Sequence, residues 1–261
     1  MSTVKDSRTI VLFDVDGTLT KPRNRVTTKV LAVLRALLQV VAVGFIGGSR
    51  IGLIEEQLGA EILKEVDYVF AENGLKTFQH GELLASTSLL EAVGEAKLQE
   101  FINFCLHYIA DLKIPQKRGT FIEFRTGMLN ISPIGRNCSQ AERDEFEAYD
   151  KEHHIREQMI EHLRERFKHL NFVYSIGGQI SFDVMPQGWT KEYALRFLSE
   201  EEYSRIVFIG DKCFEGGNDW EIFSHPRVEG YAVQNPGETI VVLRKLFPQI
   251  ETLLDPAVLA A

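Results

Sequence analysis

Cysteine is scarce in this chain of 261 residues, which has only Cys105, Cys138 and Cys213 and no pair with CxxC spacing. An odd number of cysteines without such spacing excludes a disulfide framework and favours reduced thiols, as in the cytosol. Long hydrophobic runs are also missing. No segment approaches membrane-spanning length, and the first residues lack the apolar core of a signal peptide. We therefore expect a soluble, cytoplasmic protein with no membrane partner.

Positive charge is in short supply as well. Lysine and arginine number 29 against 37 acidic residues, which gives a formal net charge of −8. A general nucleic-acid binder needs a basic face, so we expect no nucleic-acid partner. A small anionic substrate remains compatible with this balance, because a local arginine cluster can hold an anion against an acidic background.

The strongest single signal is residues 10–18, which read Ile-Val-Leu-Phe-Asp-Val-Asp-Gly-Thr. A continuous apolar run bounded by a turn signal is typical of a strand buried on both faces, as in a parallel sheet. Ligands of such sheets bind outside the carboxyl ends of the strands, where Asp14 and Asp16 would lie. Two neighbouring carboxylates repel each other, and a bound cation relieves that repulsion. Taken alone, the stretch is also compatible with a solvated Asp-rich turn.

The rest of the chain predicts an α/β core interrupted by an α+β insertion. Apolar strands alternate with helices at both ends of the chain, which is typical of a Rossmann-like parallel sheet. In between, two helices are each followed by strands with alternating polar and apolar residues, which predicts an antiparallel sheet. We assign residues 1–83 and 187–261 to the core and residues 84–186 to the inserted cap. Helices are expected at 89–112, 190–198 and from a Ser139 capping box to about 168.

Several polar residues follow the expected core strands. An aspartate such as Asp14 can accept a phosphoryl group, and a carboxylate two residues later can act as general acid and base. Ser49 follows a strand and precedes a helix, where its hydroxyl can hold a phosphate or simply cap the helix. Lys191 suits a phosphate or a carboxylate pair, although a solvated surface lysine is the alternative. Asp211 and Asp219 add oxygen ligands of the kind that Mg²⁺ prefers.

The expected cap carries a group of arginines, at positions 118, 125, 136 and 143. Guanidinium groups bind phosphate in a bidentate manner, although arginines can also serve only to make a surface soluble. Ser181 and Asp183 stand two residues apart on one expected strand and so share a face. A hydroxyl beside a carboxylate suits the hydroxyl groups of a sugar, and an ordinary wet strand face is the alternative.

These residues together resemble the haloacid dehalogenase superfamily of aspartyl-phosphate phosphotransferases. The motifs that carry the resemblance are residues 14–18, Ser49, Lys191 and residues 211–219. The resemblance implies that Asp14 is the nucleophile and Asp16 the general acid and base, while Ser49 and Lys191 hold the transferred phosphoryl group. It also implies an Mg²⁺ ion bound by Asp14, Asp16 (through its backbone carbonyl), Asp211 and Asp219.

Cap segments 119–125, 130–136, 138–140 and 175–183 resemble eukaryotic phosphomannomutases, and the resemblance spans nearly the whole chain. It implies interconversion of mannose 6-phosphate and mannose 1-phosphate for GDP-mannose synthesis, with a hexose 1,6-bisphosphate activator, activity on glucose phosphates and a homodimer formed through the caps. The phosphohexose would be bound by Arg23, Arg125, Arg136, Arg143, Ser181 and Asp183. One departure concerns residues 225–228, which read His-Pro-Arg-Val where relatives have Asp-Pro-Arg-Thr, so a second cation site is expected to be weakened.

Two other functions remain open on the sequence. A capped sugar phosphatase would use the same aspartyl phosphate and lose the group to water. A phosphosugar-binding protein without catalysis could use the same fold, although such proteins usually lose one of the motif residues that this chain keeps.

Overall fold

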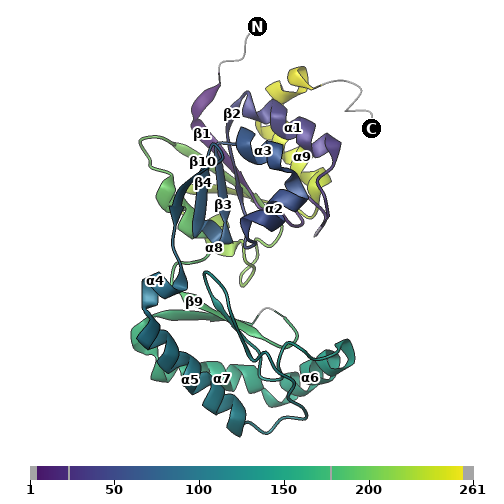
Figure 1. Cartoon of the computed structure of the whole chain (residues 1–261). Helices are drawn as coiled ribbons and strands as arrows, with labels where there is room; N and C mark the ends of the chain where they lie inside the picture. The colour runs from purple at the N-terminus through teal and green to yellow at the C-terminus, as the bar shows by residue number, and fades with distance from the viewer. Residues whose placement is uncertain (1–4, 23, 177, 255–261) are drawn as a thin grey trace. The chain divides into compact units, whose positions relative to one another are not determined.

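The computed structural model describes residues 5–22, 24–176 and 178–254 (Figure 1). The chain divides into two compact units, a core unit formed by Met1–Ser86 with Thr190–Ala261 and a cap unit formed by Thr87–Trp189. Both junctions lie three residues beyond the expected positions, after 83 and 186. The first lies later because strand β5 (Glu82–Ser86) pairs with the sheet of the core unit.

The core unit contains a seven-stranded sheet in the order β11-β10-β1-β2-β3-β4-β5. The pairs from β11 to β3 are parallel, which confirms the predicted fold class, and β4 and β5 add an antiparallel hairpin that the sequence pattern did not predict. The strands besides β5 are β1 (Asp6–Phe13), β2 (Val41–Ile46), β3 (Tyr68–Ala71), β4 (Lys76–Gln79), β10 (Arg205–Gly210) and β11 (Val228–Ala232).

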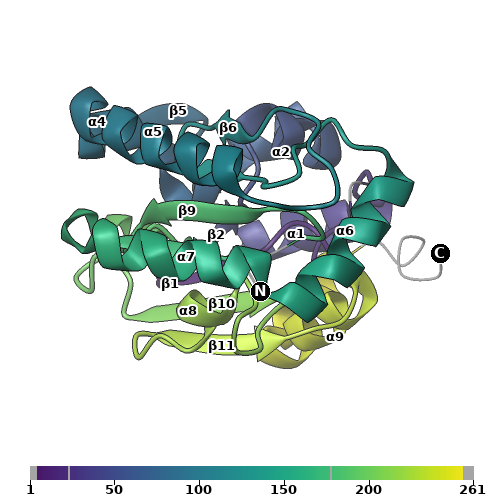
Figure 2. The same cartoon turned by 90° about the horizontal axis from the view of Figure 1, so that it is seen from below.

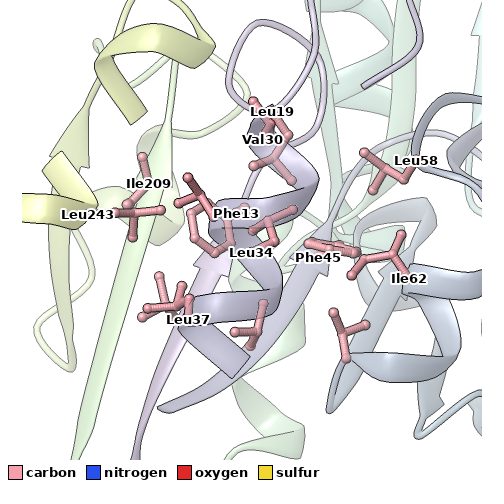
Figure 3. Packing of buried hydrophobic residues seen from close by; sticks show 14 of the residues in the cluster. Phe13, Leu19, Val30, Leu34, Leu37, Phe45, Leu58, Ile62, Ile209 and Leu243 are labelled. Atoms are coloured by element: carbon pink, nitrogen blue, oxygen red, sulfur yellow. The ribbon is translucent and has the colours of Figure 1, made fainter. Parts of the chain in front are cut away.

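The central strands of the core unit are buried on both faces because their side chains alternate between two apolar layers. Phe13, Phe45 and Ile209 face helices α1 and α9, where they pack against Leu34 and Leu243 (Figure 3). The neighbouring residues of the same strands face the segment 191–198 and helix α8. The helices of the first layer are α1 (Thr28–Leu38), α2 (Ile51–Leu58), α3 (Ala60–Glu65) and α9 (Pro236–Leu246); α8 (Trp220–Phe223) and the 3₁₀ helix η3 (Lys191–Phe197) form the second.

This topology gathers the expected site residues of the core at one edge. Phe13 at the end of β1 pairs in register with Phe45 of β2 and Ile209 of β10. Parallel strands end at the same side, so the residues that follow β1, β2 and β10 meet there.

Besides η3, the described residues form three short 3₁₀ helices. Two belong to the core unit, η1 (Glu72–Gly74) and η4 (Pro248–Leu253), and η2 (Lys168–Leu170) belongs to the cap unit.

The cap unit is built on a four-stranded antiparallel sheet in the order β6-β7-β9-β8, as the sequence predicts. Helices α5 and α7 cover one face of this sheet (Figure 2). The strands are β6 (Ile122–Phe124), β7 (Leu129–Ile131), β8 (Phe172–Ser175) and β9 (Phe182–Pro186), and the helices are α4 (Leu89–Val93), α5 (Glu95–Asp111), α6 (Gln140–His153) and α7 (Ile155–Arg166).

Three expected helices differ from the structure. The segment 89–112 is two helices, because Gly94 has a φ of 86° that no α-helix contains. The segment from 140 to about 168 breaks at His154, whose left-handed backbone ends α6. The helix expected at 190–198 is a 3₁₀ helix from Lys191. The capping box of Ser139 with Glu142 is confirmed. Within the described residues, no helix is long and apolar enough to cross a membrane.

Candidate active site

Asp14 and Lys191 meet in the interior of the core unit. Asp14 follows β1, and its backbone N–H donates to the carbonyl of Ile209, which keeps it in line with β10. Lys191, the first residue of η3, is 1% exposed, and its ammonium donates to Asp14 Oδ1. It also donates to Oδ1 of Asp219, 2.5 Å away. Lys191 is therefore a buried counter-ion of two carboxylates and not a solvated surface lysine.

The burial of this cluster shifts its ionisation. Burial raises the pKa of Asp14 to about 6, Lys191 opposes the shift, and Asp219 adds to it. Burial also raises the pKa of Asp211, again with help from Asp219. Burial lowers the pKa of Lys191, but its two carboxylate partners outweigh that effect, so its pKa is raised. Lys191 therefore stays positively charged at neutral pH.

Oxygens of Asp14, Asp211 and Asp219 lie within 4.8 Å of one another, the spacing of a possible cation site. Lys191 already engages one oxygen of Asp14 and one of Asp219. The other oxygen of Asp14, Oδ2, is buried and has no hydrogen-bond partner among the described residues. Three carboxylates gathered around the buried ammonium of Lys191 leave an excess of negative charge in the cluster, which a bound cation would offset. These residues fit a hard divalent cation such as Mg²⁺.

The turn after Asp14 needs a glycine. Gly17 has a φ of 87°, and a Cβ at this position would lie 2.3 Å from Oδ2 of Asp211. The backbone of the turn can therefore approach Asp211 only without a side chain. Thr20 closes the turn, since its carbonyl accepts from the N–H of Gly17 at 2.8 Å.

Asp16 lies in the same pocket but makes a different contact. Its Oδ1 accepts a hydrogen bond of 2.7 Å from Nε2 of Gln57, a buried residue of α2. Gln57 was not predicted as a site residue. The pocket measures about 200 Å³, and its wall includes Asp14, Asp16, Ser49, Gln57 and Asp211. Ser49 is half-buried after β2, and Arg50, not Ser49, is the N-cap residue of α2.

The candidate cap residues gather on the polar face of the antiparallel sheet. Oε2 of Glu123 accepts a hydrogen bond from Arg125 Nη2 and forms an ion pair with Arg136 Nε, each at 2.9 Å. Asn130 joins Arg136 to Ser181 and Asp183 through its side-chain amide. The guanidinium of Arg143 donates to the backbone carbonyl of Arg136 at 3.0 Å. Glu123 and Asn130 were not predicted, and Arg23 lies outside the described residues.

Comparison with known proteins decides the family. A model of the eukaryotic phosphomannomutase family matches residues 30–249 of this chain. A phosphomannomutase of Dendrobium officinale is 60% identical over 230 residues, which cover 88% of this chain and 90% of that protein. The chain belongs to the eukaryotic phosphomannomutase family. A phosphomannomutase of Oryza sativa subsp. indica is 56% identical over 247 residues, covering 95% of this chain and 99% of that one. Membership of this family makes the chain an enzyme of the isomerase class.

Solved structures confirm the fold that this family membership implies. Trehalose-6-phosphate phosphatase of Aspergillus fumigatus superposes with a TM-score of 0.57 at 20% identity, covering 95% of this chain and 92% of that one. The sucrose-phosphatase of Synechocystis gives a TM-score of 0.51 at 14% identity and covers 92% of this chain and 88% of that one. At such identities the likeness concerns the fold alone, which this chain shares with these phosphatases.

Proposed function

We propose that this enzyme interconverts mannose 6-phosphate and mannose 1-phosphate by passing a phosphoryl group through Asp14. Family membership supports the reaction, and one observation in the core supports the residue. Oδ2 of Asp14 is a buried carboxylate oxygen with no hydrogen-bond partner in the described part of the chain, and Asp14 borders the pocket. An oxygen in that position is available to attack phosphorus.

The proposed cycle begins with a hexose 1,6-bisphosphate. The Asp14 carboxylate attacks one of its phosphorus atoms, the ester P–O bond breaks, and Asp16 gives a proton to the departing sugar oxygen. In the second half, Asp16 takes the proton from a hydroxyl group of a hexose monophosphate while that oxygen takes the phosphoryl group from Asp14. Transfer to either end of the sugar, followed by rotation of the bisphosphate, gives the isomerisation.

The other polar residues of the core stabilise the charge of the transferred group. Lys191 stays ionised beside Asp14 and offsets charge that the phosphoryl oxygens bring into the buried site. The hydroxyl of Ser49 would donate to one of those oxygens from the pocket wall. We assign an Mg²⁺ site to Asp14, Asp211 and Asp219, with Asp16 contributing its backbone carbonyl. When bound, the ion would neutralise carboxylate charge and polarise a phosphoryl oxygen.

The cap unit would recognise the substrate. We assign the phosphate that is not reacting to the arginines at positions 125, 136 and 143, with Arg23 as a further proposed ligand. Ser181 and Asp183 would bind sugar hydroxyls. Two guanidinium groups that share one carboxylate oxygen of Glu123 are held close enough for one phosphate to contact both. Mannose and glucose phosphates differ at one carbon, so we expect activity on both.

We further propose that the enzyme works in the cytoplasm as a homodimer joined through its caps and supplies GDP-mannose synthesis. All three cysteines are buried thiols, which is compatible with a reducing compartment. The cap also exposes apolar side chains, among them Phe124 at 50% and Leu106 at 44%. Light scattering of the full chain, with charged replacements at these two positions, would test the dimer.

The function is tested by following phosphohexose exchange and phosphate release in one sample. With Mg²⁺ and hexose 1,6-bisphosphate present, ³¹P spectra of mannose 6-phosphate should show formation of mannose 1-phosphate by the wild-type enzyme and none by Asp14→Asn. Release of inorganic phosphate without exchange would instead identify a sugar phosphatase. Binding of phosphohexose with neither reaction would identify a non-catalytic binding protein.

A further inference from the structure

We infer that Asn130 is a positioning residue that sets the phosphate-binding and hydroxyl-binding parts of the cap at a fixed separation. The inference rests on the proposed roles of Arg136, Ser181 and Asp183. It goes beyond those roles because Asn130 itself is only 4% exposed, and all of its side-chain polar atoms already have partners in the protein. Its effect on the substrate would therefore be transmitted through the side chains that it holds.

Asn130 stands in the middle of a polar row across the cap sheet. In register, Glu123 of β6 pairs with Asn130 of β7, which pairs with Asp183 of β9. Paired residues on neighbouring strands point to the same face, and the residues next to them, such as Leu129 and Ile131, are buried on the other face. The row lies on the face opposite this apolar layer.

Each polar atom of the Asn130 side chain has a partner. Nδ2 donates to Oδ1 of Asp183 at 2.7 Å and to Oγ of Ser181 at 3.1 Å. Oδ1 accepts from Nη1 of Arg136. One amide group therefore joins the cation assigned to phosphate with both side chains assigned to sugar hydroxyls.

Only an amide meets these requirements. Its two N–H bonds face a carboxylate and a hydroxyl, and its carbonyl faces a guanidinium, so the reversed amide would oppose Asp183 and Arg136 with groups of the wrong polarity. An aspartate at this position would place a second carboxylate against Asp183. An alanine would leave three buried or half-buried polar partners without this contact.

The second anchor of Arg136 explains why the loss of Asn130 would matter for binding. Nε of Arg136 forms an ion pair with Glu123, and Nη1 donates a hydrogen bond to Asn130, so the guanidinium is held at two points. Arginine has five N–H donors in a rigid fork, and the remaining ones are thereby held in place for a phosphate. Without Asn130, Arg136 would turn about its single contact with Glu123, and Asp183 would lose its donor.

The test compares substrate affinity with core chemistry in the full-length enzyme. The variants are Asn130→Ala and, as control, Ser132→Ala. Ser132 is the next residue on the same face of the segment and is fully buried, and its hydroxyl bonds within the described residues only to backbone atoms of Ile180 and Gly135. Calorimetry would give the Kd for mannose 6-phosphate, steady-state exchange would give KM and kcat, and labelling by acetyl phosphate would report Asp14 alone.

For Asn130→Ala we expect Kd and KM to rise about 10- to 100-fold, the loss of one or two charge-assisted hydrogen bonds. We expect kcat to change by less than about threefold, because the reacting groups of the core are untouched. Acetyl phosphate labelling and the Ser132→Ala affinity should match those of wild type. An unchanged Kd in a folded Asn130→Ala variant, or an equal loss in Ser132→Ala, would overturn the inference.

A polarity swap covers the case in which a single variant misfolds. Asn130→Asp should bind mannose 6-phosphate more weakly than wild type. The same change in an Asp183→Asn background should cost little, because the new amide at position 183 can donate to the new carboxylate at position 130. Equal losses in both backgrounds would contradict the link. Absence of exchange in the wild-type enzyme would count against the proposed function, while the affinity comparison would still decide the role of Asn130.

Discussion

The buried ammonium of Lys191 donates a hydrogen bond to Asp14, the residue proposed as nucleophile, and a second one to Asp219. Because Asp219 in turn accepts from the backbone N–H of Lys212, the ammonium joins the start of η3 to the segments that follow β1 and β10. The same side chain therefore stabilises the fold of the core and the charge at its reactive edge.

Replacing this lysine should damage stability and chemistry together. Lys191→Met keeps the length of the side chain but leaves two buried carboxylates without a cation, a loss that typically costs about 3–5 kcal/mol. Chemical denaturation at pH 7 should show that loss, and acetyl phosphate labelling of Asp14 should fall below detection. Lys245→Met, at an exposed position of α9, should leave both measurements unchanged.

The raised pKa of Asp14 predicts a pH-dependent stability in the absence of metal. Its pKa is about 6 in the folded chain and has an ordinary value of 3.8, so the folded state holds the proton more tightly. The stability that this proton provides is complete below pH 3.8 and disappears as the pH rises through about 6. Asp14→Asn lacks this dependence. The melting temperature of the variant minus that of wild type, both in EDTA, should therefore increase between about pH 4.5 and pH 7; a constant difference would contradict the assignment.

The same ionisation predicts how Mg²⁺ acts on the first chemical step. In the proposed mechanism the ionised carboxylate of Asp14 attacks phosphorus, so labelling by acetyl phosphate should weaken as the pH falls below about 6. A divalent cation favours the ionised form of Asp14. Raising the Mg²⁺ concentration should therefore shift the acidic limb of the labelling profile, where labelling falls with pH, to lower pH. A limb that stays in place across a wide range of Mg²⁺ concentrations would argue against metal contact with Asp14.

Gln57 should control the turnover more than the affinity. Gln57→Leu removes the donor to Asp16 with little change in volume, so Asp16, the proposed general acid and base, would lose part of its orientation. General acid–base catalysis contributes about 10²- to 10⁴-fold, and we expect kcat to fall about 10- to 100-fold with a small change in KM. Gln39→Leu, an exposed control after α1, should behave as wild type. A change confined to KM would show that Gln57 acts on binding.

Gly17 offers a direct test of the turn around the acidic cluster. Gly17→Ala forces a side chain into a backbone with a φ of 87° and places its Cβ 2.3 Å from Oδ2 of Asp211. We expect the rise in melting temperature on adding Mg²⁺ to be lost. Gly52→Ala is the matched control, since nothing lies within 4 Å of its added Cβ inside α2, and it should be neutral or stabilising by about 1 kcal/mol. An unchanged Mg²⁺ response in Gly17→Ala would place the cation elsewhere.

The core could be predicted from the sequence because its strands are continuous apolar runs and its polar residues directly follow them. The position of Asp14 needs only β1 and the rule for parallel sheets. The sequence pattern did not predict that the expected helices are interrupted at Gly94 and His154, because the helical spacing of apolar residues continues across a single residue with positive φ. Glycine at 94 was the available signal.

The contacts of Gln57 and Asn130 could not be predicted, because their partners are distant in sequence. Gln57 lies 41 residues from Asp16, and Asn130 lies 51 and 53 residues from Ser181 and Asp183. Asn130 did fall on the polar side of an alternating strand, but strands of three residues leave register undetermined until the partner strands are in place. The depth of Lys191 likewise depends on how η3 packs.

Phosphoryl transfer through Asp14 is tested most directly by a rapid-quench experiment with hexose 1,6-bisphosphate that carries ³²P on both phosphates. With Mg²⁺ present, peptides from the acid-quenched enzyme should carry one labelled acyl phosphate per chain at Asp14, and a chase with unlabelled mannose 6-phosphate should move that label into hexose bisphosphate. We predict that transfer to sugar exceeds release of inorganic phosphate by a wide margin. Label on another residue, or label lost mainly to water during the chase, would contradict a phosphomannomutase mechanism through Asp14.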